Sequence, residues 1–364
     1  VWFLKARGEG ANWIMTRRTT IALIAFLAVN VVSVHYSGLS SMMEMAGQWY
    51  IYLIFYFIII SNINSTDEFV KTVWALVLSG MFIVYYGIYA VAYELPSAIG
   101  GRAGAYGVYE NHNDYTYMII LIFPFIINLM KTTGSRLLRL VLLAFALSCV
   151  AGVFMSLSRG GMIALVASLF FIFRTSKRSF IMTALVAIFA VGAIGYQWQK
   201  RDENQSGNYS YQDSKGSRLE LWKAAGEMVK KHPLLGIGSK RFDEYAKDYY
   251  EISHDNRGKN AHNTYVEVLA TTGIAGFIAF IFFIYHTGKA VLAKKAGGEA
   301  FGADDEKLSI MAQAVALSFL GILVRSLFNS KTHDWSLYML AAFSVAYVKL
   351  KAEERSAKAV EASG

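Results

Sequence analysis

Charged residues are scarce in this chain of 364 residues, at 17% of the total, whereas 55% are hydrophobic and 15% aromatic. An average soluble domain carries about 25% charged residues, so the composition argues against a water-soluble enzyme and against a disordered chain. The presence of only three prolines argues against collagen-like or proline-rich repeats. The single cysteine, Cys149, lies within an apolar run. Neither a disulfide framework nor a cysteine metal cluster is therefore expected.

The net charge of +9 would suit a nucleic-acid-binding protein only if the basic residues gathered on a polar face. They flank long apolar runs instead, which is typical of proteins that span a membrane. We therefore expect a polytopic membrane protein that binds the lipid bilayer and no nucleic acid. A spanning helix needs about 20 mostly apolar residues. The segments that meet this need lie near 19–36, 46–61, 70–93, 115–130, 138–156, 160–173, 179–197, 264–287, 308–328 and 335–350.

The run from Leu140 to Phe173 is almost unbroken apolar sequence. As one helix it would measure about 50 Å, too long for a hydrocarbon core of about 30 Å. Its only polar interruption is the segment 156–161, which reads Ser-Leu-Ser-Arg-Gly-Gly. Basic residues flank both outer ends of the run, and such flanks belong on the cytoplasmic side. We therefore predict a hairpin with Arg159 at its external tip.

Basic residues also precede the first predicted span and follow the eighth and tenth, on the same predicted cytoplasmic side. The one large polar segment then falls outside. We interpret the start at Val1, without a signal-peptide pattern, as a truncation that removed one or more earlier spans. The predicted organisation is seven spans over 1–197, an external loop with an amphipathic helix over 198–262, three spans over 263–350 and a cytoplasmic tail over 351–364.

Polar and charged side chains gather on the predicted external side of the membrane. Arg102 and Asn113 lie in the loop before the fourth span, and Arg325 ends the ninth span. Arg159 lies at the hairpin tip, among serines and glycines. An arginine fork matches the geometry of phosphate, and neighbouring glycines leave room for an anion. Each arginine alone could be one that snorkels at the interface, but their convergence on one face favours an anion-binding site.

The segment 217–220, Ser-Arg-Leu-Glu, fits a helix capping box and predicts a helix that begins at Ser217 and ends near Lys231. An apolar face with Leu219 and Trp222 would place this amphipathic helix on the outer membrane surface. Arg218 would occupy its first turn, where free backbone amides and the helix dipole favour anions. The alternative is an exposed first-turn arginine without a ligand.

His262 and Asn263 directly precede an apolar helix predicted over residues 264–285. Thr272 and Gly276, small residues four apart, permit close packing on a neighbouring span and would hold the histidine rigidly. A histidine with an ordinary pKa of about 6.5 suits general-base work, although an interfacial histidine can also be purely structural. The spacing of the nearby His254 and Asp255 fits no strong metal signature, so we expect neither metal nor cofactor.

These motifs together resemble the O-antigen ligase and O-antigen polymerase superfamily of bacterial membrane glycosyltransferases, and the ligases most. The ligase signature is His, then Asn, Ser or Gln, nine residues, Gly, two residues, then Gly, Thr or Tyr. The chain fits it in full from His262 to Gly276. Three further segments resemble the family across about residues 100 to 330: Asn-x-Asn-Asp at 111–114, Ser-Arg-Gly at 158–160, and Arg218-x-x-x-Trp222 followed by His-Pro-Leu-Leu-Gly-Ile-Gly at 232–238.

The resemblance implies an all-α, polytopic transmembrane helical bundle of the GT-C-like type and a metal-independent, inverting glycosyltransferase. The donor would be a glycan on undecaprenyl diphosphate, with Arg159 and Arg218 on the diphosphate. His262 would deprotonate the acceptor hydroxyl of lipid A–core during lipopolysaccharide biosynthesis. The site would lie at the periplasmic face of the bacterial inner membrane. Four residues would support it: Arg102, Asn113, Asn263 and Arg325.

Other acceptors stay open at this stage. An O-antigen or exopolysaccharide polymerase would use another repeat unit, and a protein O-oligosaccharyltransferase would use serine or threonine. A transporter or flippase of lipid-linked sugars is the alternative from a different class. Such a transporter should carry ionisable residues at the membrane midplane and broken helices in paired repeats. The charges here lie at one surface, which favours chemistry over translocation.

Overall fold

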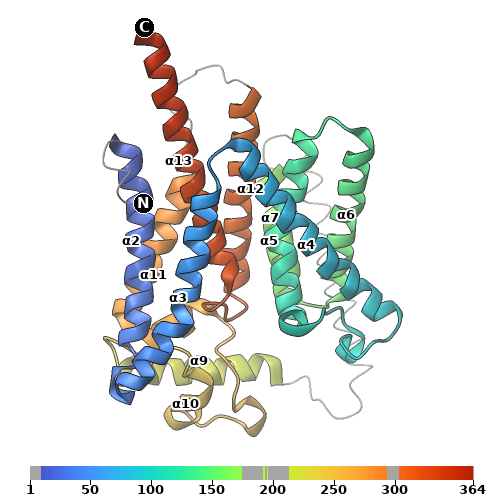
Figure 1. Cartoon of the computed structure of the whole chain (residues 1–364). Coiled ribbons are helices and arrows are strands. Elements are labelled where there is room, and N and C mark those ends of the chain that lie inside the picture. The colour runs from blue at the N-terminus through green and yellow to red at the C-terminus, as the bar shows by residue number, and fades with distance from the viewer. Residues whose placement is uncertain (1–9, 174–191, 193–194, 196–212, 293–302, 364) are drawn as a thin grey trace. The chain divides into compact units, whose positions relative to one another are not determined.

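The computed structural model describes residues 10–173, 192, 195, 213–292 and 303–363. Within these residues the chain forms α-helices, short 3-10 turns and no strand, which confirms the predicted all-α fold (Figure 1). Apart from residues 192 and 195, the predicted span 179–197 lies outside the described residues, as does the first part of the predicted external loop, 198–212.

The helices form two compact units. Unit 1 comprises residues 1–69, 213–300 and 329–364, and unit 2 comprises residues 70–212 and 301–328. The helices of unit 1 are α2 (Gly10–Val32), α3 (Leu39–Asn62), α9 (Asp213–Lys231), α10 (Phe242–Tyr249), α11 (Thr264–Leu292) and α13 (Trp335–Ser363). Unit 2 contains α4 (Thr66–Ala92) from residue 70 onward, α5 (His112–Thr132), α6 (Arg136–Met155), α7 (Arg159–Phe173) and α12 (Ala303–Ser326).

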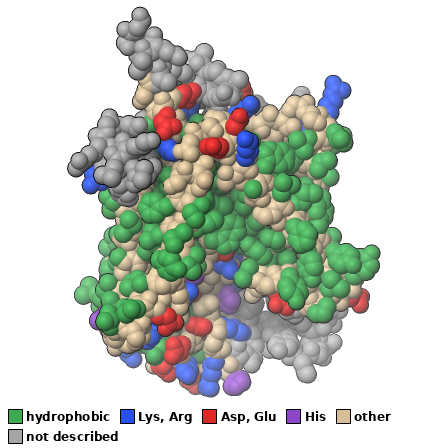
Figure 2. Space-filling view, in the orientation of Figure 1, with side chains coloured by type: hydrophobic (Ala, Val, Ile, Leu, Met, Phe, Trp, Pro, Cys, Tyr) green, Lys and Arg blue, Asp and Glu red, His purple; other side chains and the backbone are tan. Residues whose placement is uncertain are grey.

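Seven of the described helices are long and apolar enough to cross a membrane, so the chain is a multi-pass membrane protein. Figure 2 shows hydrophobic side chains along the helices on the visible face and charged side chains towards their ends. The predicted sixth span corresponds to the shorter apolar helix Arg159–Ile172. The predicted tenth span lies in α13, which is not among the seven because serine, tyrosine and lysine residues interrupt its apolar sequence. The seven are Arg17–Ser37, Leu39–Asn62, Thr66–Ala92, His112–Thr132, Arg136–Met155, Thr264–Leu292 and Glu306–Ser326.

Unit 2 is organised around α5, which packs against α6, α7 and α12 and is buried over most of its length. The break predicted in the apolar run 140–173 is present, because α6 ends at Met155 and α7 begins at Arg159. Leu157 makes the turn with a positive φ of 53°. The Ser158 hydroxyl accepts a hydrogen bond from the Gly161 amide at 3.3 Å and so caps α7.

In unit 1, α11 packs against α2, α9 and α13 (Figure 1). The helix predicted over 264–285 is present within α11, and it is kinked at Gly273, which has φ 65° and ψ −167°. The loop 233–238 fills this break with four backbone hydrogen bonds. They run from Ile274 N to Pro233 O (2.8 Å), Ala275 N to Leu234 O (3.2 Å), Ile237 N to Ala270 O (3.1 Å) and Gly238 N to Thr271 O (2.9 Å).

Two glycines of the predicted signature have different roles in this packing. A Cβ atom at Gly273 would overlap the backbone carbonyl group of Leu234, so the loop can approach only a glycine. A Cβ atom at Gly276 would overlap the side chain of Thr272 in the same helix, 2.0 Å from its Oγ1, and would lie 3.3 Å from Cγ1 of Val29 in α2. The loop 232–238 therefore packs directly on Gly273 and joins the end of α9 to α11.

Alanine at position 273 is expected to destabilise the protein by about 1–3 kcal/mol. The backbone conformation of Gly273 is one that almost only glycine adopts. The measurement is the midpoint of thermal unfolding of the purified protein in detergent. Gly226→Ala is the matched control: Gly226 lies in α9 with nothing within 4 Å of a Cβ atom. Alanine there should raise the midpoint slightly through helix propensity. Equal midpoints for the two variants would contradict the prediction.

Candidate functional site

A buried arginine joins three helices of unit 2 at the site predicted from the sequence. Arg325, at the end of α12, is 0% exposed. Its Nη2 donates to Asn113 O and to Asn113 Oδ1, both at 3.0 Å, and to the hydroxyls of Thr116 (3.2 Å) and Ser158 (3.4 Å). The Ser158 hydroxyl in turn donates to Asn113 Oδ1 at 2.8 Å. Asn113 and Arg325 therefore fix the beginnings of α5 and α7 against the end of α12.

Arg102 holds the turn that precedes Arg159. Its Nε donates to Ser156 O at 3.0 Å and its Nη2 to Leu157 O at 3.4 Å, which satisfies carbonyls at the end of α6. The next residue, Ala103, donates its amide to Met155 O at 2.9 Å. The loop and the hairpin turn are thus one hydrogen-bonded unit.

Arg159 is the first residue of α7 and is half-buried. The glycines after it were expected to leave room for an anion, but they serve helix packing instead. A Cβ atom at Gly160 would lie 2.5 Å from Cβ of Phe328, and one at Gly161 would lie 2.8 Å from Cβ of Thr116. The surroundings of Arg159 still favour an anion, because two helix N-termini meet beside it, those of α5 and α7.

In unit 1, His262 occupies a turn with an unusual backbone. Its φ is 52°, in the left-handed region that few residues other than glycine adopt. Asn263 caps α11, because its Oδ1 accepts the amides of Tyr265 (3.0 Å) and Val266 (3.1 Å). Asparagine and serine, two of the three residue types that the predicted signature allows here, are both strong N-caps. Asn263 is therefore explained as a structural residue of the His262 turn.

The helix that carries Arg218 differs from the prediction in its start. α9 begins at Asp213, before the predicted cap Ser217, so the capping-box prediction is wrong. Arg218 lies beyond the first turn, where the amides already have helical partners, and the helix dipole does not favour an anion there. Its neighbour one turn on, Trp222, donates from Nε1 to Ala261 O at 2.9 Å. Since residues four apart share a helix face, Arg218 lies on the face of α9 directed to the His262 turn.

The packed face of α9 also differs from the predicted one. Leu219 and Trp222, expected on the apolar face, are 55% and 41% exposed. The buried face contacts loop residues, α10 and α11 rather than being left for the membrane. Its residues are Leu221, Ala224, Ala225 and Met228, which pack on Ile237, Phe242, Ala246, Ile252, Ala261 and Ala270. The helix is therefore amphipathic as predicted, but it covers protein.

Glu220 binds the loop that leads to His262. Its Oε2 accepts from the Ser253 amide (3.1 Å), the Ser253 hydroxyl (2.9 Å) and Asn256 Nδ2 (2.8 Å). The hydrogen bond from Asn256, followed by those from Ser253, holds the pKa of Glu220 below its ordinary value. The charged carboxylate therefore stabilises this loop at pH values above the ordinary pKa of glutamate. This stabilisation is lost as the pH falls through the lowered pKa of Glu220.

Acidification is accordingly expected to loosen the loop 253–256 in the wild-type protein and to have less effect in Glu220→Gln, which cannot titrate. Hydrogen exchange of the loop amides at neutral and acid pH measures the difference. An identical pH dependence of exchange in the two proteins would show that Glu220 does not control this loop.

His333 is a second histidine of unit 1, and it packs against Trp49 with the ring centroids 4.5 Å apart. Burial and the nearby charge of Lys240 lower the pKa of His333 to about 3. A general base works best with a pKa near the operating pH, so His333 is poorly suited to that role. Among the described residues, no group of three or more His, Cys, Asp or Glu side chains could hold a metal ion.

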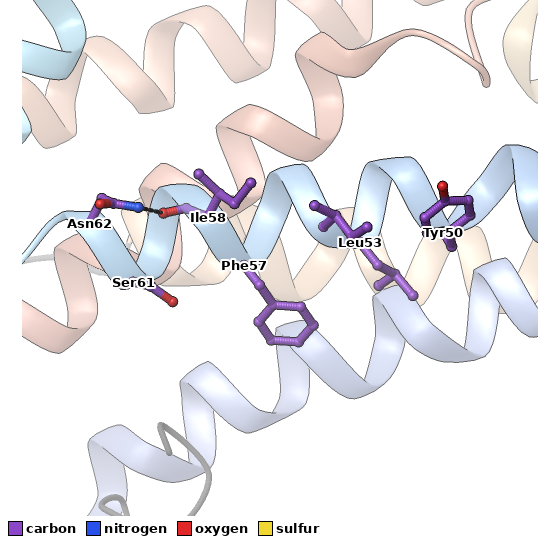
Figure 3. A pocket seen from close by; sticks show the side chains of 7 residues that line it. Tyr50, Leu53, Phe57, Ile58, Ser61 and Asn62 are labelled. Atoms are coloured by element: carbon purple, nitrogen blue, oxygen red, sulfur yellow. Dashed lines mark hydrogen bonds between the residues drawn. The ribbon is translucent and has the colours of Figure 1, made fainter.

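A shallow groove of about 400 Å³ lies along α3 (Figure 3). It is lined mainly by apolar side chains such as Leu53 and Phe57, and Asn62 at its end donates to Ile58 O at 2.8 Å. It brings together no basic or carboxylate side chains. None of the residues predicted for the site lines this groove.

The sequence-predicted residues thus form one group in each unit: Arg102, Asn113, Arg159 and Arg325 in unit 2, and Arg218, His262 and Asn263 in unit 1. Two features of this region were not predicted from the sequence. One is the hydrogen bond from Trp222 to Ala261, and the other is the burial of Glu267. Only the apolar surroundings of Glu267 in the sequence could have drawn attention to it.

Residues 142–281 match a family model described as O-antigen ligase. The matched segment lies within the region where the resemblance was expected, and it contains Arg159, Arg218 and His262. No curated protein matches the chain. With the membrane spans, the family match indicates a membrane glycosyltransferase of the general O-antigen ligase or polymerase type.

Proposed function

We propose that this chain, a member of the O-antigen ligase superfamily, moves a glycan from undecaprenyl diphosphate to a hydroxyl of lipid A–core at the periplasmic face of the inner membrane. One observation carries the proposal: the family match includes both arginines proposed for the donor and the histidine proposed as the base. The full fit of the segment from His262 to Gly276 to the ligase signature favours a ligase over a polymerase.

The donor diphosphate would be bound by Arg159 and Arg218. Arg159 is suited to this by its place at the start of α7, beside the start of α5, where both helix dipoles favour an anion. Arg218 is suited by its position on the face of α9 that Trp222 directs to the His262 turn. Arg102 and Asn113 would keep the Arg159 turn in place, and Arg325 would do so from the end of α12. Arginines aimed at the leaving diphosphate would stabilise the charge that develops as it departs.

His262 would act as the general base. The acceptor oxygen attacks the anomeric carbon as the bond from that carbon to the diphosphate oxygen breaks, and the lipid diphosphate leaves with the electron pair. His262 takes the proton of the acceptor hydroxyl. A single displacement of this kind inverts the anomeric centre, and the arginines supply the charge stabilisation without a metal or cofactor. Asn263, as the cap of α11, would keep the base at the helix start.

The test of the function is deletion of the gene in its host, followed by gel analysis of the lipopolysaccharide. A ligase is expected to leave lipid A–core without any long glycan. A single repeat unit left on the core would identify a polymerase, the second candidate, and unchanged lipopolysaccharide would favour an exopolysaccharide polymerase or a protein O-oligosaccharyltransferase. Transfer by the purified protein in detergent micelles, where no compartments exist, excludes a flippase.

The periplasmic location predicts which loops react with an impermeant thiol reagent added outside spheroplasts. The background variant is Cys149→Ala, since Cys149 is the only cysteine. Cysteines replacing the exposed Tyr106 and Arg257 should react, whereas a cysteine at the exposed Gly134 should not. Permeabilised cells provide the control in which all three react. Labelling at Gly134 with protection of Tyr106 would reverse the proposed orientation.

A further inference from the structure

An exposed tyrosine lies at the tip of the loop between α4 and α5, in unit 2. Tyr106 is 81% exposed, and Val108 in the same tip is 74% exposed. Single apolar side chains are often exposed on protein surfaces, so exposure alone does not indicate a ligand. Two further features distinguish Tyr106. The backbone around it is closely packed, and its loop is hydrogen-bonded to the turn before Arg159.

Close backbone contacts restrain the loop on both sides of its tip. A Cβ atom at Gly104 would lie 2.5 Å from Glu110 O and 3.1 Å from Ser97 O, so three backbone segments meet there. The Ala105 amide donates to Tyr109 O at 2.8 Å, which closes the tip. The residue at the tip is therefore presented by a backbone with little freedom to move.

The ring of Tyr106 is also oriented by a neighbouring aromatic side chain. Tyr86 of α4 packs against it with the ring centroids 6.3 Å apart and the ring planes at 90°, an arrangement that aromatic pairs prefer. Since Tyr106 is 81% exposed in the presence of this contact, most of its surface is open to a ligand. A tyrosine has only two side-chain torsions, so an oriented ring binds a partner at a low cost in conformational entropy.

The same loop brings this ring close to the residue proposed to bind the donor diphosphate, Arg159. The Ala103 amide donates to Met155 O at 2.9 Å, and Arg102 donates to the carbonyls of the next two residues. Tyr106 follows Ala103 by three residues, which span at most about 11 Å. The first sugar of a lipid-linked glycan is attached directly to the diphosphate, so a ring at this distance from the turn can contact the glycan.

We propose that Tyr106 is the aromatic surface of a sugar-binding subsite, on which a pyranose ring of the donor glycan stacks beside the diphosphate. This inference rests on the proposed function, because it presupposes a glycan-bearing donor at Arg159. One face of a pyranose presents mainly C–H groups, which are apolar and slightly positive, and the face of an aromatic ring is apolar and negative. Tyrosines also gather at membrane interfaces. The hydrogen bonds between this loop and the Arg159 turn favour the glycan over the bilayer.

The experiment measures equilibrium binding of two lipids by the purified full chain in detergent. One lipid is undecaprenyl-diphosphate-linked O-antigen, and the other is undecaprenyl diphosphate without a glycan. The variants are Tyr106→Ala, Tyr106→Phe and Tyr106→Trp. Tyr93→Ala is the matched control, because Tyr93 is an exposed tyrosine at the start of the same loop and packs on Tyr89 with the ring centroids 4.4 Å apart. Transfer to lipid A–core gives kcat and the KM for the donor.

Tyr106→Ala should weaken binding of the glycan-bearing lipid by about 3- to 10-fold and raise its KM by a similar factor, with kcat nearly unchanged. Its affinity for undecaprenyl diphosphate should equal that of the wild type, because that lipid has no sugar to stack on the ring. Phenylalanine and tryptophan keep an aromatic face, so both variants should bind the donor within about twofold of the wild type. Tyr93→Ala should match the wild type with both lipids.

Normal binding of the glycan-bearing lipid by Tyr106→Ala would overturn the proposal. So would an equal loss of affinity for both lipids, which would indicate a role in folding or in anchoring to the membrane, and so would a loss that phenylalanine and tryptophan do not rescue. The proposed function fails separately, if the wild-type protein transfers no glycan to lipid A–core. Binding then still decides the inference, since the subsite requires the wild type to bind the glycan-bearing lipid more tightly than Tyr106→Ala does.

Discussion

Replacement of His262 by alanine is expected to abolish glycan transfer while binding of the lipid-linked donor survives. General-base assistance contributes about 10²–10⁴ in rate, and its loss lowers kcat rather than affinity for the donor. The turn itself should persist in the variant, because Asn263 still caps α11 and the Ala261 carbonyl still accepts from Trp222. The measurement is transfer by the purified variant, together with its binding of undecaprenyl-diphosphate-linked glycan.

The pH dependence provides a second check on this role. The wild-type rate should fall at acid pH, as the imidazole takes up a proton and can no longer accept one from the hydroxyl. His254→Ala is a suitable control, because His254 lies exposed in the same loop. If His262→Gln keeps substantial activity and the acid limb, another group is the base, and His262 only orients the acceptor.

Lysine at Arg159 or at Arg218 is expected to reduce transfer severely while leaving the protein folded in the membrane. Lysine keeps the charge but loses the planar fork that binds two phosphate oxygens at once. The loss should extend to donor affinity, in contrast to His262→Ala, because these arginines are proposed to bind the diphosphate before the reaction. The measurement is the KM for the donor and kcat in each variant.

Arg257→Lys is the matched control for these substitutions, since Arg257 is exposed in the loop before His262. It should transfer glycan at the wild-type rate. Near-normal activity of both Arg159→Lys and Arg218→Lys would instead show that these arginines only snorkel at the interface. Arg325 is not suited to this test, because it is fully buried and its substitution would disturb the packing of α5, α7 and α12.

The sequence by itself determined the fold class and the membrane character. Long apolar runs can only be helices in a bilayer, because each backbone polar group must find its partner within the segment. The break before Arg159 was also predictable, because a run too long for one span had a single polar interruption. The motif around His262 was sufficient to suggest the family, which the match over residues 142–281 supports independently.

Only the tertiary structure decided how the predicted residues are held. The capping box at Ser217 failed because residues 213–216 are already helical, and Glu220 binds Ser253 and Asn256 instead of the helix start. The break at Gly273 exists because the distant loop 233–238 supplies its hydrogen bonds. Arg325 and Trp222 act on residues far away in the chain, Asn113 and Ala261. Local patterns carry propensity and periodicity, whereas these contacts depend on which helices fold against each other.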